Sequence, residues 1–255
     1  MPLEILTIPC LSDNYAFLIR NDALKLTALV DAPEAAPIRD ALQDRGWGLD
    51  MIFLTHHHND HIDGVEELRA EYGPAIVGAA ADTHRLPPLD VEVEDGTVFT
   101  FAGEDVEIFD VSGHTNGHIA FYLPDSQAVF TADSLMALGC GRLFEGTPER
   151  MWESLSKLAA LPPETIVHSG HEYTASNAKF ALTIDPHNPA LQKRVQEITK
   201  ARAADIPTVP SKLSDELATN PFLRANDPQV KAGLDMQDAP DAVVFKEIRR
   251  RKDIF

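Results

Sequence analysis

The densest group of potential metal ligands lies in residues 55–61, THHHNDH, directly after a short apolar run. Successive side chains of an extended segment point to opposite sides, so His56 and His58 are expected to project together. Asp60 and His61 follow where the chain turns toward the next helix. Imidazole and carboxylate groups suit zinc, iron or manganese. Four potential ligands within six residues exceed what one tetrahedral ion takes from so short a segment, which favours two ions.

The alternative interpretation of residues 55–61 is a solvated histidine-rich loop or the remnant of a purification tag. Tags lie at chain termini and lack the aspartate, whereas this segment follows an apolar stretch that is expected to form a strand. A motif gains its meaning from its structural context, and this context favours metal ligands.

Three further candidate ligands each follow a predicted strand. His114 lies in the glycine-rich segment SGHTNGH, where the backbone can approach a metal closely. Asp133 follows the run VFTA, and His171 follows the run IVHS and one glycine. Strand ends are where α/β architectures place their sites. Taken alone, each of these residues is more often structural, but together with residues 55–61 their order and spacing become specific.

The elements that must position these residues are predicted from the spacing of apolar residues and turn residues. Short apolar runs predict buried strands, and amphipathic runs predict helices. Between Val91 and Thr131, five β-type runs separated by turn residues predict a meander of antiparallel strands. Thr147 followed by Pro148 predicts a helix start. The predicted strands outside the meander are 26–30, 51–54, 76–80 and 165–168, and the predicted helices are 37–45, 63–72 and 147 to about 160.

The character of the chain changes after His171. Strand signals vanish there, and helical stretches alternate with breaks that contain proline. The sequence therefore predicts two domains, an α/β (α+β) domain over residues 1–171 and a small α-helical domain over residues 172–255.

Composition and charge restrict the possible partners. The net charge of −18 argues against nucleic acid and an anionic membrane as partners, so an anion would need a local basic cluster such as residues 249–252. Hydrophobic residues make up 44% of the chain, but none of its apolar runs approaches the roughly 20 residues of a membrane helix. The N-terminus lacks a secretory pattern, and two cysteines cannot form a disulfide framework, so we expect a cytoplasmic protein.

In order and spacing, the candidate ligands resemble the metallo-β-lactamase superfamily, whose pattern is His-x-His-x-Asp-His, then a later His, an Asp and a final His. A closer resemblance is to the glyoxalase II (hydroxyacylglutathione hydrolase) family. It extends over nearly the whole chain, including the helical C-terminal part that most superfamily members lack. The matching segments are 13–15, 55–61, 113–115, 130–133, 139–142, 170–174, 220–224 and 249–253.

The resemblance implies an αββα sandwich followed by the helical domain, with two divalent metal ions per chain. Zinc is the expected metal, and iron or manganese would suit the same ligands. Asp60 and Asp133 are also implied to be catalytic. The implied ligands are His56, His58 and His114 for one metal, Asp60, His61 and His171 for the other, and Asp133 as the bridge between them.

The substrate that the resemblance implies is a glutathione thioester, S-D-lactoylglutathione, which gives D-lactate and glutathione in methylglyoxal detoxification. Two metals about 3.5–4 Å apart lower the pKa of a bridging water to about 7, and the hydroxide would attack the thioester carbonyl. The implied glutathione-binding residues are Arg142, Tyr173, Arg249 and Lys252. On electrostatic grounds alone, residues 249–252 could equally serve only to favour a helix C-terminus.

Four residues depart from common choices in the family, and none is an implied metal ligand. Ala132 stands where glycine is frequent, and Arg142 where lysine is common. Phe144 stands where a tyrosine that contacts the substrate is often found, so one hydroxyl contact is absent. Asp63 replaces a small residue and adds a carboxylate, which could also cap a helix.

Other functions are compatible with parts of this sequence. A persulfide dioxygenase shares the fold and the first motif but uses one iron, and generally lacks the segments 220–224 and 249–253. Another hydrolase of the same fold would act on a β-lactam, a lactone or a phosphodiester, although the charge of −18 disfavours a nuclease. A metal sensor without catalysis is a third alternative. We expect a monomer or a weak homo-oligomer.

Overall fold

The computed structural model describes residues 3–255, and the chain divides into two compact units. Unit 1 comprises the residues up to Asp110 together with Asn116–Thr131. Unit 2 comprises Val111–Thr115 together with Ala132–Phe255. The proposed domain boundary at residue 171 is a different division, and it stays a prediction.

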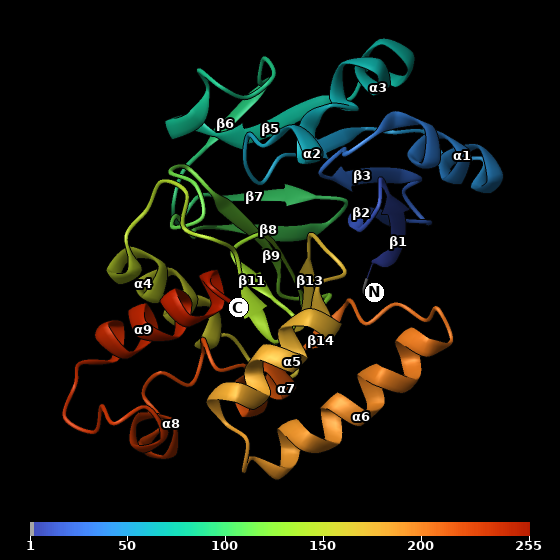
Figure 1. The fold of residues 1–255 in the computed structure, drawn as a ribbon. Coiled ribbons are helices and arrows are strands. Elements are labelled where there is room, and N and C mark those ends of the chain that lie inside the picture. Colours follow the sequence, from blue (N-terminus) through green and yellow to red (C-terminus); the bar gives the residue numbers. More distant parts are fainter. Residues whose placement is uncertain (1–2) are drawn as a thin grey trace. The chain divides into compact units, whose positions relative to one another are not determined.

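Unit 1 begins with a six-stranded sheet whose strands follow the chain order β1 to β6 (Figure 1). The first three strands are antiparallel, and β3, β4, β5 and β6 run parallel. The parallel strands β3 and β4 are joined through the helix α1, and β4 and β5 through α2 and α3, as parallel pairing requires. These elements are β1 (Glu4–Cys10), β2 (Asn14–Asn21), β3 (Leu26–Val30), α1 (Ala35–Arg45), β4 (Met51–Phe53), α2 (Asn59–Ile62), α3 (Val65–Tyr72), β5 (Ala75–Ala79), the 3₁₀ turn η1 (Ala80–Asp82) and β6 (Val91–Val93).

The second sheet has the strand order β14-β13-β10-β9-β8-β7. Four of its strands form the predicted antiparallel meander: β7 (Val98–Phe101), β8 (Glu104–Asp110), β9 (Ile119–Leu123) and β10 (Ala128–Ala132). The prediction that residues 91–93 open this meander is wrong. They form β6, which pairs with β5 in parallel at the edge of the first sheet, because tertiary pairing and not the local run decides the sheet.

An aromatic cluster packs the two sheets of unit 1 against each other. Phe53, on β4, is fully buried, and its ring stacks on Phe121 of β9 at a centroid distance of 5.1 Å. Two rings of β7, Phe99 and Phe101, meet the same phenylalanine edge-on at 5.5 and 5.7 Å. Because β4 leads directly into the segment 55–61, this cluster also fixes the start of the histidine-rich segment.

Unit 2 contains the remaining helices, with α4 beside α9 and α5 beside α6 (Figure 1). The helix α4 begins as predicted, with the Thr147 hydroxyl accepting a hydrogen bond from the backbone N–H of Arg150 and Pro148 at the first position. The elements are β11 (Leu135–Met136), β12 (Gly139–Cys140), α4 (Pro148–Ala159), β13 (Ile166–Ser169), α5 (Thr174–Ile184), α6 (Pro189–Ala203), β14 (Ser211–Lys212), α7 (Leu213–Thr219), α8 (Pro228–Gly233) and α9 (Asp241–Asp253).

The fold is the mixed α/β fold that the sequence predicts, with two six-stranded sheets and a helical C-terminal region. The short β14, which pairs with β13, was not expected, since two residues carry too little periodicity to indicate a strand. Over residues 3–255, none of the helices is both long and apolar enough to cross a membrane.

The aromatic cluster yields a stability prediction. Replacing the fully buried Phe53 by alanine leaves a cavity among three rings, so the free energy of unfolding should fall by about 3–5 kcal/mol. Urea denaturation followed by circular dichroism measures the change. Val98→Ala, at a side chain that is 54% exposed, is the control and should change the stability little. Equal stabilities of the two variants would contradict this account of the core.

Candidate metal centre

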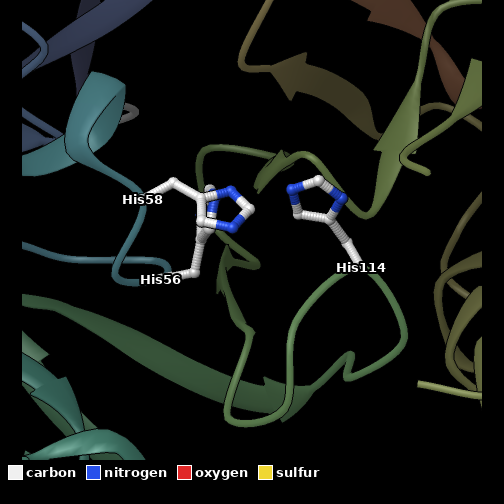
Figure 2. A group of neighbouring side chains, drawn as sticks. All are labelled: His56, His58 and His114. Carbon is white, nitrogen blue, oxygen red and sulfur yellow. The ribbon is translucent and has the colours of Figure 1, made fainter. Parts of the chain in front are cut away.

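The histidine-rich segment of unit 1 runs from the end of β4 to α2. Backbone angles at His58 are extended, with φ −63° and ψ 140°, and the helix starts at the next residue. Figure 2 shows the rings of His56 and His58, which lie edge to face with centroids 4.7 Å apart. The ring of His61 lies 4.3 Å from that of His56. Extended backbone followed by one helical turn thus gathers three imidazoles from six residues of chain.

A buried carboxylate, Asp31, orients two of these imidazoles. It lies at the end of β3, is 3% exposed, and accepts hydrogen bonds from both the backbone N–H and the hydroxyl of Thr55, at 2.9 and 2.8 Å. His61 directs its Nδ1 at the same carboxylate, 2.8 Å away. The Thr55 hydroxyl also lies 3.0 Å from Nδ1 of His56. A histidine whose Nδ1 is held in this way presents Nε2 to a metal.

The middle histidine of the segment points in another direction. His57 Nδ1 lies 2.9 Å from a carboxylate oxygen of Asp82, which is fully buried. Arg85 binds the other oxygen of Asp82 and donates to the backbone carbonyl of Asn116, at 2.8 Å. These bonds tie the segment to residues 116–118, where His118 stacks on His56 at 4.5 Å. His57 therefore anchors the segment.

Asp60 is a candidate ligand of unit 1 that is accessible to solvent. Its side chain is 43% exposed, and one carboxylate oxygen lies 3.8 Å from Nε2 of His61. The side-chain amide of Asn14 donates to that oxygen at 3.0 Å and to the Asp60 carbonyl at 2.9 Å. Asn14 thus fixes the direction of a carboxylate that a small molecule can reach.

In unit 2, one carboxylate lies between two imidazoles. Asp133 follows β10, and its Oδ2 lies 3.4 Å from Nε2 of His114 while its Oδ1 lies 3.3 Å from Nε2 of His171. All three residues are buried. The backbone reaches this arrangement through a left-handed conformation at Ala132, with φ +39°, where glycine would carry less strain. A carboxylate with one oxygen toward each imidazole is the arrangement expected of a ligand shared by two metals.

Gly141 packs closely against Asp133 and His114. An added Cβ would overlap the carbonyl oxygen of Asp133 and lie 2.9 Å from Nδ1 of His114. The next residue, Arg142, accepts a hydrogen bond from that same Nδ1 on its backbone carbonyl, at 2.7 Å. As with His61, the engaged Nδ1 turns Nε2 of His114 toward the carboxylate.

The four residues implied in glutathione binding have different environments in unit 2. Tyr173 is 41% exposed, and its ring stacks on His171 at 4.6 Å. The guanidinium of Arg142 is exposed and lies 3.6 Å from Asp253. Arg249 is buried and bonded within unit 2.

Lys252 is half-buried. Its ammonium lies 5.2 Å from the ring centroid of Phe180 and 5.3 Å from that of Phe255. Burial, with a smaller contribution from the positive charge of Arg249, lowers the pKa of Lys252.

The cysteines are unsuited to nucleophilic attack. Burial raises the pKa of the Cys140 thiol to about 11 and that of Cys10 to about 12, so neither forms a thiolate at neutral pH. His168 is buried on β13, and burial lowers its pKa to about 3, which keeps it neutral. The chemistry of the donors, imidazole nitrogens and carboxylate oxygens, fits a divalent transition metal or zinc.

Sequence reasoning did not single out Asp31, Asp82 or Thr55. Their hydrogen-bond partners lie 24 to 30 residues away along the chain, and the spacing of residues in the sequence does not reveal such buried contacts. Asn14 could have been found, because it belongs to the Asp-Asn-Tyr motif that carries part of the family resemblance.

Comparison with known proteins covers the whole chain. The family model described as metallo-beta-lactamase superfamily matches residues 13–171, and the model described as hydroxyacylglutathione hydrolase C-terminus matches residues 172–255. A hydroxyacylglutathione hydrolase from Ruegeria pomeroyi is 65% identical over the full length of both chains.

Solved structures give the same fold. The di-iron-bound form of TTHA1623 is 29% identical with a TM-score of 0.57, covering 66% of this chain and 91% of that one. The BLEG-1 B3 metallo-beta-lactamase is similar in fold, with a TM-score of 0.65 at 22% identity, covering 86% and 99%.

Gly141 provides a test of the local geometry in unit 2. Gly141→Ala should lower the metal content per chain and reduce stability by about 1–3 kcal/mol, because the new methyl group overlaps a backbone carbonyl that cannot rotate away. Elemental analysis and thermal unfolding measure both effects. Gly48→Ala is the matched control, since an added Cβ there has open space. Wild-type metal content in Gly141→Ala would show that this close approach does not matter.

Proposed function

The chain belongs to the hydroxyacylglutathione hydrolase family of the metallo-β-lactamase superfamily, and on this basis we propose that it hydrolyses S-(2-hydroxyacyl)glutathione to a 2-hydroxy acid and glutathione. The substrate we propose is S-D-lactoylglutathione, which yields D-lactate. The proposal rests on the 65% identity to a hydroxyacylglutathione hydrolase over the full length of both chains. This identity extends over the C-terminal region as well as over the region of the candidate ligands.

We propose a centre of two divalent metals. In this proposal, His56, His58 and His114 would bind one metal, and Asp60, His61 and His171 would bind the other. Asp133 would be the shared ligand, which its position between His114 and His171 supports. Zinc is the metal we expect, and the di-iron form of a relative supports iron as an alternative.

The chemistry that such metals supply when bound is a water with its pKa lowered to about 7 and a Lewis acid for the carbonyl oxygen. The residues of the chain do the rest. Asp133 would hold its two oxygens toward His114 and His171, as they lie within unit 2. Asp60, held by Asn14 and accessible, can accept a hydrogen bond from the attacking water and orient it. Asp31 keeps Nδ1 of His61 engaged while the ring is a ligand.

Substrate binding would use the polar residues at the surface of unit 2. Glutathione carries two carboxylates, for which the guanidinium of Arg142 and the ammonium of Lys252 are suitable donors. Tyr173, stacked on His171, presents a hydroxyl beside a metal ligand. The leaving thiol has an ordinary pKa near 8.5, so it can depart as a thiolate without a dedicated acid.

We further propose that the enzyme acts in the cytoplasm, in methylglyoxal detoxification. Both cysteines are free and buried, as suits a reducing compartment. A persulfide dioxygenase would differ in metal content, with one iron per chain.

Activity and metal content test the function together. Purified protein should release thiol from S-D-lactoylglutathione, contain about two metals per chain, lose activity to a chelator and regain it with Zn²⁺. Asp133→Asn should lower kcat by about a hundredfold and reduce the metal content. Asp125→Asn, in an exposed turn, is the control and should leave both unchanged. A protein with two metals and no thioesterase activity would exclude the proposed substrate, and one iron per chain would favour the dioxygenase.

The pKa of Lys252 predicts a pH dependence of KM. The ammonium is charged below its pKa, and burial lowers that pKa, so the charge is lost at a lower pH than the ordinary lysine value of about 10.4. KM should therefore rise with alkaline pH, while Lys252→Arg, which stays charged, should keep a flat KM. Lys252→Ala should raise KM about tenfold at neutral pH. Initial rates, corrected for spontaneous thioester hydrolysis, measure KM. Identical pH profiles for wild type and Lys252→Arg would contradict the assignment.

A further inference from the structure

The ammonium of Lys252, on α9, lies against two aromatic rings of unit 2. Its Nζ is 5.2 Å from the ring centroid of Phe180 and 5.3 Å from that of Phe255. Both distances fall within the roughly 6 Å over which the face of a ring attracts a cation. The two rings meet edge to face, with centroids 5.5 Å apart. One cation is therefore held by a pair of rings that also contact each other.

The partners of Lys252 differ from those of the neighbouring cations on α9. Arg249 donates to Asp253 at 2.8 Å, and Arg250 donates to Glu247, also at 2.8 Å. Within the described residues 3–255, Lys252 forms no ion pair with a carboxylate. A ring face attracts the charge of an ammonium without using up its N–H donors in strong hydrogen bonds. These donors can therefore bind a carboxylate that comes from a substrate.

The aromatic contacts continue from Lys252 to Arg249, one helical turn earlier. The ring of Phe180 stacks on that of Phe222 at a centroid distance of 5.9 Å, and the guanidinium of Arg249 lies 5.2 Å from the Phe222 centroid. Burial and the positive charge of Arg249 both lower the pKa of Lys252 and so disfavour its charged form. The negative faces of the rings act in the opposite direction and favour a cation at this position.

The two rings that contact Lys252 come from different parts of unit 2. Phe180 lies on α5 and is only 1% exposed, and its stacking on Phe222 fixes it in the core. Phe255 lies two residues beyond the end of α9 and is 62% exposed. The backbone N–H of Phe255 donates to the carbonyl of Lys252 at 3.3 Å, which brings its ring to the same side of the chain as the lysine. The ammonium thus has one ring anchored in the core and one at the surface.

We propose that Phe180 and Phe255 are positioning residues for the substrate: their rings hold the ammonium of Lys252 in the place where it binds a carboxylate of the glutathione thioester. The inference rests on the proposed function in taking Lys252 as a substrate contact. It adds residues that act through the lysine and do not themselves bind the anion.

The physical reason for such positioning is the flexibility of a lysine side chain. A long side chain that is disordered in the free protein loses rotamer freedom when a ligand orders it, and this loss weakens binding. Lys252 is ordered by the two rings before any ligand arrives, so binding a carboxylate costs less entropy. An exposed ring such as Phe255 contributes little to the core, and its effect on substrate binding can be measured without unfolding the protein.

The test compares variants of Phe255 in the full-length protein. Phe255→Leu removes the ring and keeps an apolar side chain, whereas Phe255→Tyr keeps the ring face. Ile254→Ala is the matched control, because it shortens the neighbouring apolar side chain, which is 76% exposed. KM and kcat are measured with S-D-lactoylglutathione, and circular dichroism checks the fold. Phe255→Leu is also made in the Lys252→Ala protein.

Phe255→Leu should raise KM about threefold and change kcat little, because the ring acts on the binding cation and not on the reacting atoms. Phe255→Tyr and Ile254→Ala should keep the wild-type KM. In the Lys252→Ala protein, Phe255→Leu should have no further effect, since the cation on which the ring acts is gone.

A second measurement follows the lysine itself and needs no catalysis. Protons above the face of an aromatic ring resonate upfield in NMR spectra. With ¹³C-labelled lysine, the ε-CH₂ signal of Lys252, identified by its loss in Lys252→Arg, should lie upfield in the wild type. It should move toward the ordinary lysine position in Phe255→Leu, and in the same direction in Phe180→Leu.

An equal rise in KM from Phe255→Leu with and without Lys252 would overturn the proposal, since the ring would then act independently of the lysine. A wild-type KM in Phe255→Leu, or an ε-CH₂ signal that does not move, would overturn it as well. If the wild type does not hydrolyse the thioester, the proposed function fails, whereas the NMR signal still decides whether the rings hold the ammonium.

Discussion

The position of the Asp133 carboxylate between two imidazoles is the constraint on which the local structure of unit 2 depends. A buried carboxylate is destabilising unless polar or charged groups surround it, and here one imidazole lies beside each oxygen. To reach this position, the chain leaves β10 through a left-handed alanine and returns past a glycine that admits no side chain. The chain therefore has local strain and a close approach of two segments where Asp133 meets the imidazole of His114.

Unit 1 follows the same physical rule with a different carboxylate. In our proposal Asp31 binds no metal. It orients the ring of His61 directly, through Nδ1, and the ring of His56 through the hydroxyl of Thr55. A histidine that binds a metal through one nitrogen almost always donates the N–H of the other to an acceptor, which fixes its tautomer and ring orientation. In His114 that acceptor is a backbone carbonyl, so the orientation of the ligand depends on the path of the 139–142 segment. In our proposal, the orientation of the metal ligands thus depends on residues that do not themselves bind metal.

The part of the structure that could be predicted from sequence was the part set by short-range periodicity. Alternation in an extended segment places the rings of His56 and His58 together, and the strands 26–30 and 51–54 were located within one residue. The meander prediction failed for residues 91–93, because the sheet to which a short run belongs is set by distant partners. Asp31 was missed for the same reason. The burial of Arg249 could not be predicted from the sequence either, since a basic run at a helix end is equally consistent with exposed and buried side chains.

The net charge of the chain determines where attraction for an anionic substrate can come from. With a net charge of −18, the field of the protein repels a thioester that carries two carboxylates, and screening confines any local attraction to about 8–10 Å. Attraction must therefore come from cations close to the bound substrate. Arg249 is paired with Asp253 and Arg250 with Glu247, so neither contributes a full positive charge at the surface. In our proposal Arg142 and Lys252 supply this attraction, so each has a large share in binding the substrate.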